Sequence, residues 1–255
     1  MSQTNALEDP PTAPRTSTLD RPTLMRLAAT EYARFATMLT SLDARDWTQP
    51  TECAGWDVRA MAGHVLGMAE MAASIREGRR QRKAAAQRGG VFIDALTALQ
   101  VQERAVLTPE QVSERFQALG PRAARARRRT PALIRRRKMP MQQAVGGLPE
   151  TWALGYLIDT ILTRDPWMHR IDISRATGRP LSLSADHDGV LVGDVVTEWA
   201  ARHHAPCRLD LTGATGGSWT FGEGGPRIEL DAIEFCRTVS GRERGTELLA
   251  TEVPF

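Results

Sequence analysis

Apolar side chains recur every three or four positions through most of the first 180 residues. This spacing puts them on one face of an α-helix, so it favours a bundle of amphipathic helices. Leu24, Leu27 and Phe35 form the first stripe, and Asp20 and Pro22 ahead of it are typical of a helix start. Because 42% of the 255 residues are hydrophobic, such helices can bury a substantial core. The same pattern predicts a helix from near Asp57 to Ile75 and another from near Pro149 to near Gly178. Two further helices are predicted to begin near Val91 and near Pro109.

The pattern changes after residue 181, where short alternating segments replace the long helical stripes. A Gly-rich stretch between two of these segments indicates a β-hairpin. We therefore predict a mainly α fold, with a helical bundle over residues 20–180 and a small α+β domain over 181–255. Residues 1–19, rich in Pro, Thr and Ser, are expected to form a flexible leader. In the second domain we expect helices over 188–202 and 233–240, and strands over 207–213, 217–224, 227–231 and 248–255.

Charge and cysteine content exclude several classes of protein. The 33 basic residues nearly balance the 30 acidic ones, whereas a protein held to nucleic acid by phosphate contacts is usually more lopsided. Three scattered cysteines are too few for a disulfide scaffold or a cysteine zinc motif. No apolar run approaches the ~18 residues that cross a bilayer, and the N-terminus lacks the features of a signal peptide. We expect a cytoplasmic protein without a membrane partner.

One segment departs from this charge balance. Residues 121–138 contain nine basic residues and no acidic one, a density that suits phosphate contacts. The segment has no aromatic side chain to stack on bases, and no recognised nucleic-acid-binding module surrounds it. It can equally form a solvated helix face, or attract anionic substrates to an entrance. Nucleic-acid binding is therefore the minor hypothesis for this segment.

Three side chains of metal-binding type fall on the inward faces of two predicted helices. His64 follows Met61 by three residues, on the same apolar stripe, and Asp165 and His169 are four residues apart on another. Asp172, three residues further on, can orient His169. Buried imidazoles and carboxylates are costly unless they pair with each other or with a metal. Two imidazoles and one carboxylate from facing helices suit zinc or a similar divalent ion, with one coordination position left open.

The spacing alone leaves other interpretations open. An inward histidine is more often a hydrogen-bonded core residue than a ligand. Pro166 is expected to kink its helix, in which case Asp165 is a cap where the helix restarts. His187, His203 and His204 lie near a predicted domain boundary and a helix end, where they need no ligand role.

Three segments of the chain carry a family resemblance. TECAGWDVRAMAGHVLGMAE (51–70) has a Gly-Trp loop leading into a helix with a histidine, LTRDPWMHRIDISRATGRP (162–180) holds the second ligand helix, and FCRTVSGRERGTELLATEVPF (235–255) ends the chain. They resemble the mycothiol-dependent maleylpyruvate isomerase family, within the DinB-like superfamily. The resemblance implies a metal-binding four-helix bundle, a small α/β domain behind it, and mycothiol, a small thiol, as cofactor or co-substrate. In the first segment we expect Trp56 to be a packing anchor and Cys53 an inert thiol.

The resemblance, carried over residue by residue, implies metal ligands at His64, Asp165 and His169. The family pattern usually has Glu at the position of Asp165. Asp is one methylene shorter, so the metal must sit closer to the backbone or a water must bridge the gap. The resemblance also implies that Arg242, in a Ser-Gly-Arg turn, reaches the active site as a catalytic residue. Its planar guanidinium suits a substrate carboxylate, and a solvated surface arginine is the alternative.

These features predict a metal-dependent, mycothiol-dependent enzyme. A divalent ion such as zinc holds a bound thiol as the nucleophilic thiolate, which attacks a small electrophilic substrate, with Arg242 binding a carboxylate of that substrate. If the thiol then leaves, the reaction is a maleylpyruvate-type cis–trans isomerisation, and if it stays attached the reaction is an S-transfer. The alternatives are a non-catalytic small-molecule-binding protein and, less favoured, a nucleic-acid-binding protein that uses residues 121–138.

Overall fold

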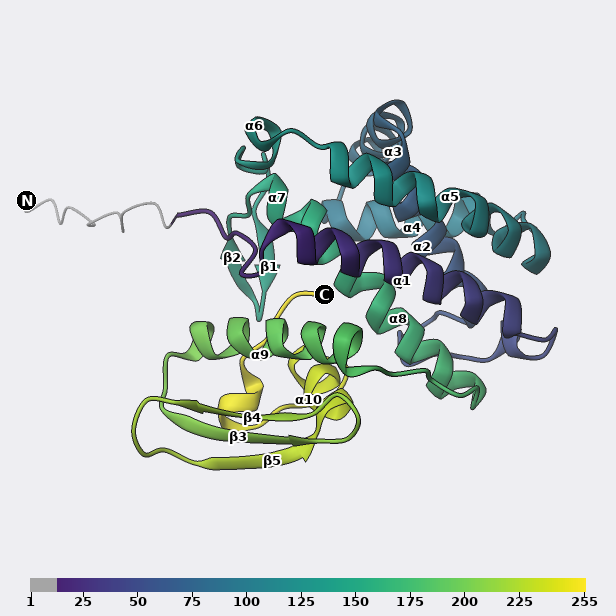
Figure 1. Cartoon of the computed structure of the whole chain (residues 1–255). Helices are drawn as coiled ribbons and strands as arrows, with labels where there is room; N and C mark the ends of the chain where they lie inside the picture. The colour runs from purple at the N-terminus through teal and green to yellow at the C-terminus, as the bar shows by residue number, and fades with distance from the viewer. Residues whose placement is uncertain (1–12) are drawn as a thin grey trace, which may run out of the picture.

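The computed structural model describes residues 13–255, and its fold is mainly α, as predicted (Figure 1). Four long helices form a bundle in which α1 and α2 each contact both α5 and α8. A further pair of helices, α3 and α4, packs against α2. The bounds are α1 Arg21–Ser41, α2 Val58–Ala73, α3 Ile75–Arg88, α4 Phe92–Arg104, α5 Pro109–Arg129 and α8 Leu162–Thr177.

The residues that the sequence marks as helix starts do begin helices. The Asp20 side chain accepts a hydrogen bond from the backbone N–H of Thr23 at 2.9 Å, and Asp57 accepts one from Ala60 at 2.7 Å. Such caps satisfy N–H groups that have no partner inside the helix. The predicted stop at Gly178 is confirmed, because this glycine takes the left-handed conformation after α8. Among the described residues, no helix combines the length and apolar character that a membrane span requires.

The second part of the chain is a three-stranded sheet with helices packed on it. The central strand β3 pairs with β4 in antiparallel and with β5 in parallel orientation, so the predicted hairpin and third strand are confirmed. Helix α10 packs against β3, β5 and α9, and α9 lies between the sheet and the bundle in Figure 1. The bounds are α9 Val190–His203, β3 Cys207–Thr212, β4 Gly217–Phe221, β5 Arg227–Asp231 and α10 Ala232–Val239.

An apolar core runs across the junction of the two parts. Trp167, Met168 and Ile171 of α8 belong to one buried cluster with side chains of α9, β3 and α10. Ile173 of the same helix belongs to a second cluster, which fills the bundle between α1, α2 and α5. Helix α8 therefore contributes to both cores. The domain boundary predicted at residue 180 falls in the connection after α8 and stays a prediction.

Some predicted element bounds are wrong. The helix expected from Pro149 starts only at Leu154, because Gly146 and Gly147, both with positive φ, turn a short hairpin there. The stripe expected to continue to Ile75 breaks one residue earlier, where the Ser74 side chain caps α3. The elements that replace the start of the expected long helix are β1 Gln143–Val145, β2 Leu148–Glu150, α7 Leu154–Tyr156 and a π-helical turn, η2 Leu157–Ile161.

The strand expected at the C-terminus is also wrong. A 3-10 turn, η4 (Glu247–Ala250), and an irregular tail occupy these residues. The backbone N–H of Val253 donates to the Val239 carbonyl at 2.8 Å, and the Val253 side chain is buried in the second part's core. The tail therefore packs on α10 instead of extending the sheet, whose strands are β4, β3 and β5 in the described chain.

The predicted flexible leader (1–19) is described only from residue 13, and the earlier residues lie outside the described chain. Its described part is hydrogen-bonded to the rest of the fold, and its flexibility stays a prediction. The backbone N–H of Arg15 donates to the Thr151 carbonyl at 2.9 Å, and Thr18 is hydrogen-bonded to Asp194 on α9. The polar residues of this stretch find partners on both parts of the fold, which composition alone does not reveal.

The Arg-rich segment (121–138) completes α5 and forms a short helix, α6 (Ala132–Arg135). Two of its arginines serve the fold, because Arg127 is buried and Arg135 pairs with Asp159. Most of its other basic side chains are exposed. Nucleic-acid binding by this segment remains a prediction.

Candidate metal centre

The loop before α2 and the cap of that helix position His64. Asp57 fixes the start of α2, which places His64 two turns further along, with 5% of its surface exposed. The loop is closed around Trp56, whose carbonyl accepts hydrogen bonds from both the N–H and the hydroxyl of Thr51 at 2.9 Å. The chain therefore delivers an imidazole and an indole to the same place.

Helix α8 carries the other two predicted ligands, Asp165 and His169. It continues through Pro166, so Asp165 is not the cap of a restarting helix. Because proline has no N–H, the Leu162 carbonyl lacks its i→i−4 partner. Buried Arg127 of α5 donates to this carbonyl at 2.9 Å and to another in the preceding π-helical turn at 2.7 Å. An arginine from a neighbouring helix thus compensates for the proline.

The three predicted ligands converge in the structure. Oδ1 of Asp165 lies 3.2 Å from Nε2 of His64 and 3.5 Å from Nε2 of His169. One donor atom from each residue lies within 4.8 Å of the other two. Oδ2 of Asp165 is buried and has no hydrogen-bond partner, which is costly for a carboxylate unless a ligand satisfies it. Two imidazole nitrogens and a carboxylate form a donor set that fits zinc or a similar divalent ion.

The other nitrogen of each imidazole is held by a polar side chain. Nδ1 of His169 donates to Asp172 at 3.0 Å, which agrees with the orienting role expected of that carboxylate, and Nδ1 of His64 lies 2.8 Å from Oε1 of Gln100. Arg242 reaches Asp172 with both Nε and Nη2, each at 2.7 Å. Partners of this kind fix the ring orientation of metal-binding histidines. Arg242, predicted from the resemblance, therefore lies directly behind the candidate ligands.

Electrostatics at the point of convergence favour a cation. Burial opposes ionisation of Asp165, but His64 and His169 outweigh it and lower the pKa of the carboxyl. Burial also opposes a charged His169, yet Asp165, followed by Asp172 and Cys53, raises the pKa of the imidazole well above its ordinary value. The carboxylates at this site thus stabilise positive charge between the two rings. A bound metal ion would supply such a charge.

Arg242 is brought to the site by ion pairs between the second part and the loop before α2. Arg237 of α10 is almost fully buried and reaches Glu52 at 2.8 Å, and Arg175 of α8 lies 2.9 Å from the same carboxylate. Gly241 then turns the chain with φ 80°, a conformation that favours glycine. The backbone N–H of Arg242 donates to the Arg237 carbonyl at 3.0 Å. The guanidinium is consequently held over α8.

The structure adds neighbours that the sequence reasoning left out. Trp56 has its ring centroid 5.3 Å from that of His64 and 6.0 Å from that of His169, so it covers both imidazoles as well as anchoring the helix start. Cys53, half-buried, can form a second donor group with His169 and Asp172. The sequence feature that could have indicated Cys53 is its position in the Gly-Trp loop. Of the remaining histidines, His187 contacts Glu31 and His203 packs on Trp199.

Trp56 also faces an open cavity of about 550 Å³ on the other side of the loop. Its wall continues over the first turn of α2, with Asp57 and Arg59, and over Val101 and Ala105 at the end of α4. Trp56 therefore lies next to the candidate metal centre and also lines a space of the size that small ligands occupy.

A helical bundle that gathers two histidines and a carboxylate, followed by a small α+β part, defines a DinB-like protein. Residues 28–174, more than half of the chain, match the family model of the mycothiol maleylpyruvate isomerase N-terminal domain. The chain therefore belongs to this family. The match includes His64, Asp165 and His169 and ends before Arg242.

Two solved structures resemble the whole chain. A crystal structure of the mycothiol-dependent maleylpyruvate isomerase aligns over 90% of this chain and 93% of its own, with 14% identity and a TM-score of 0.58. A histidine-to-alanine mutant of that isomerase aligns over the same shares with 14% identity and a TM-score of 0.55. At this identity the likeness establishes the fold. No curated protein matches the chain.

Proposed function

We propose that this chain is a metal- and mycothiol-dependent enzyme that acts on a small electrophile. The observation that carries the proposal is the convergence of His64, Asp165 and His169, with Oδ2 of Asp165 buried and unpartnered. Family membership supports mycothiol as the thiol, because solved relatives of this fold are described as mycothiol-dependent. Zinc is the proposed ion, since imidazole and carboxylate donors suit it.

The three ligand residues would hold the ion and leave one coordination position open. When bound, the ion stabilises the thiolate form of a thiol, which is the nucleophilic form. Asp172 keeps a proton on Nδ1 of His169, so Nε2 is the nitrogen left to bind the ion. Trp56 covers both rings and limits access of water to them.

Arg242 is proposed to bind a carboxylate of the substrate. Its Nε and one N–H of Nη2 are used by Asp172, and Nη1 donates one N–H to the Ser240 hydroxyl at 3.3 Å. One N–H on each of Nη1 and Nη2 is left for a second carboxylate. The side chain is 14% exposed, so it is not sealed from solvent. A fixed positive charge there also stabilises negative charge that develops on the substrate during nucleophilic addition.

Two reactions fit this arrangement and differ in the fate of the sulfur. In a cis–trans isomerisation of the maleylpyruvate type, the sulfur leaves again after rotation about the former double bond. In an S-transfer it stays on the electrophilic carbon. We favour the isomerisation, because the solved relatives of this fold are described as isomerases.

Metal content tests the proposal first. We expect purified wild-type protein to contain close to one equivalent of divalent metal by elemental analysis, and His169→Ala to contain little. His204→Ala is a matched control, since His204 lies outside the site at the end of α9 and should not affect metal content. Wild-type protein that stays metal-free after reconstitution with zinc would refute the proposal. Loaded protein should then convert cis-configured electrophilic acids only when mycothiol is present.

A further inference from the structure

Two glutamines without a sequence-predicted role are fully buried beside the candidate metal centre. Gln100 of α4 places Oε1 2.8 Å from Nδ1 of His64, and its Nε2 lies 3.0 Å from Oε1 of Gln81 on α3. Gln81 in turn places Nε2 2.9 Å from a carboxylate oxygen of Glu77. An unbroken chain of hydrogen bonds thus runs across three helices, from an imidazole ring on α2 through α4 to a carboxylate on α3.

The donor-to-acceptor direction of these hydrogen bonds is fixed at the end of the chain where Gln81 meets Glu77. Nε2 of Gln81 also lies 3.2 Å from the Gly67 carbonyl, and both a carbonyl and an ionised carboxylate can only accept hydrogen bonds. The Gln81 amide must therefore turn its NH2 group toward Glu77 and its oxygen toward Gln100. Gln100 donates to that oxygen, which turns its own oxygen to His64. The imidazole must then donate from Nδ1.

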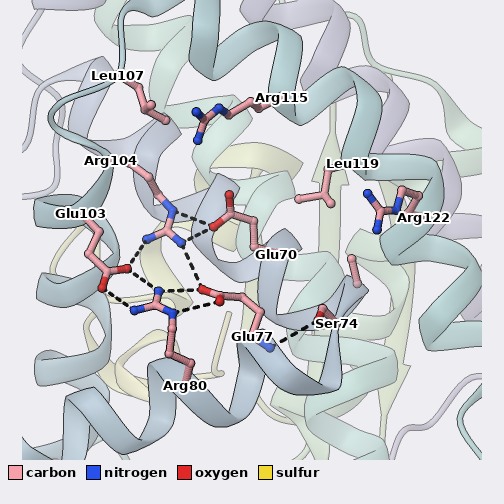
Figure 2. A pocket seen from close by; sticks show the side chains of 11 residues that line it. Glu70, Ser74, Glu77, Arg80, Glu103, Arg104, Leu107, Arg115, Leu119 and Arg122 are labelled. Carbon is pink, nitrogen blue, oxygen red and sulfur yellow. Dashed lines mark hydrogen bonds and ion pairs between the residues drawn. The ribbon is translucent and has the colours of Figure 1, made fainter.

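Glu77 is held in its ionised form by arginines that line a pocket on the outside of the bundle (Figure 2). Arg80 donates to both of its oxygens, at 2.6 and 2.9 Å, and Arg104 lies 3.9 Å away. The hydrogen bonds from Arg80, together with one from Gln81, outweigh burial and lower the pKa of the Glu77 carboxyl. The Glu77 carboxylate, at the end of the hydrogen-bond chain, therefore accepts hydrogen bonds at neutral pH.

A glycine on α2 allows Gln100 to approach closely enough. A Cβ at Gly67 would lie 2.7 Å from Cγ and 2.8 Å from Cβ of Gln100, closer than real Cβ contacts. Glycine within a helix costs roughly 0.5–1 kcal/mol relative to alanine, so a packing requirement explains its presence here. The same glycine supplies the carbonyl that orients Gln81.

We propose that Gln81 and Gln100 are positioning residues, which form a hydrogen-bond chain of fixed direction from Glu77 that keeps a proton on Nδ1 of His64 and so leaves Nε2, which faces Asp165, as the nitrogen for a metal ion. This inference rests on the proposed metal site for its functional meaning. An imidazole can ligate only through an unprotonated nitrogen, and the partner of the other nitrogen decides which one that is. The chain prepares His64 for ligation before any metal arrives.

The tautomer of His64 in metal-free protein tests the chain directly. Long-range ¹H–¹⁵N correlation spectra in mildly alkaline buffer should show a proton on Nδ1 of His64 in the wild type. In Gln100→Leu the acceptor for this proton is lost, and a substantial population protonated on Nε2 alone should appear. Gln102→Leu is the matched control, because it makes the same change on the exposed face of the same helix and should keep the wild-type tautomer.

Zinc affinity, measured by competition with a chromophoric chelator, gives the second readout. We expect Gln100→Leu to weaken binding by about 10–100-fold, as loss of a partner behind a ligand does elsewhere, and Gln102→Leu to bind like wild type. If Gln100→Leu does not fold, Gln81→Leu tests the next link, where a smaller loss in the same direction is expected.

A wild-type His64 whose Nδ1 carries no proton overturns the inference, whatever the metal result. The inference is also overturned if Gln100→Leu and Gln81→Leu both fold and both bind zinc with wild-type affinity. A wild-type protein that binds no metal refutes the proposed function, and the tautomer measurement then still decides whether the hydrogen-bond chain runs in the direction that Glu77 imposes.

Discussion

Asp172→Asn probes the candidate centre in depth, because one buried carboxylate holds both His169 and Arg242. The Asp172 side chain is fully buried and accepts hydrogen bonds from the imidazole at 3.0 Å and from two guanidinium nitrogens at 2.7 Å. An asparagine has the same shape but one acceptor oxygen. Its NH2 group must therefore face either the imidazole or the guanidinium, and each choice removes an interaction that the carboxylate makes.

If the NH2 group faces His169, Nδ1 becomes an acceptor and the proton moves to Nε2, the nitrogen proposed to bind metal. We expect zinc affinity to fall by about 10–100-fold, which corresponds to roughly 1.4–2.8 kcal/mol. In either orientation the largely buried guanidinium of Arg242 loses its charged partner, and the free energy of unfolding should fall by about 3–5 kcal/mol. Both losses follow from the same substitution, so they must be separated experimentally.

The double variant Asp172→Asn/Arg242→Met separates them. Removing the unpaired cation should recover part of the stability in urea unfolding, whereas the zinc affinity in chelator competition should stay low. Asp210→Asn is a useful control, since Asp210 also lies between two arginines but at the surface of the sheet, and it should leave zinc binding unchanged. Zinc affinity and a free energy of unfolding in Asp172→Asn that both equal those of wild type would refute the assigned role of Asp172.

Three further substitutions test other parts of the structure. Asp165→Glu should keep or strengthen metal binding, because the longer carboxylate still reaches both imidazoles, and loss of metal in elemental analysis would contradict this. Arg127→Met should lower the free energy of unfolding in urea by about 3 kcal/mol relative to the exposed control Arg128→Met, since two buried carbonyls lose their donor. Equal midpoints for these two variants would disprove the compensating role. Burial opposes ionisation of Glu198, but Arg164 and then Arg202 outweigh it and lower its pKa below the ordinary value of 4.5. Its stabilising contribution is therefore complete above about pH 4.5 and is lost as the pH falls through the lower folded-state pKa, so Glu198→Gln should flatten the acid side of the stability profile, and parallel profiles would contradict the reasoning.

The helical period explains why the candidate ligands could be predicted. It fixes which residues of one helix share a face, and this was sufficient for Asp165, His169 and Asp172 on α8. It places His64 on an inward face as well. That the two helices meet at one point was a hypothesis based on their inward faces, and the family resemblance also implied it.

What the period does not encode is the contact between side chains of different helices. Gln100 reaches His64 only because Gly67 lets α4 approach α2, and nothing in the local sequence around Gln100 indicates this. The misplaced helix start near Pro149 has a different origin. Pro and Glu are typical of a first helical turn, but the two glycines ahead of them favour a hairpin, and the hairpin forms.

The apolar core shared by the two parts has a consequence for how the molecule unfolds. Trp167, Met168 and Ile171 alternate along α8 with Asp165 and His169, so the helix presents the candidate ligands and also anchors the sheet. Burial of such side chains contributes about 1.5–3 kcal/mol each, and removing the sheet would forfeit it. We therefore expect a single cooperative melting transition, in which loss of the C-terminal sheet and loss of the ligand geometry are one event.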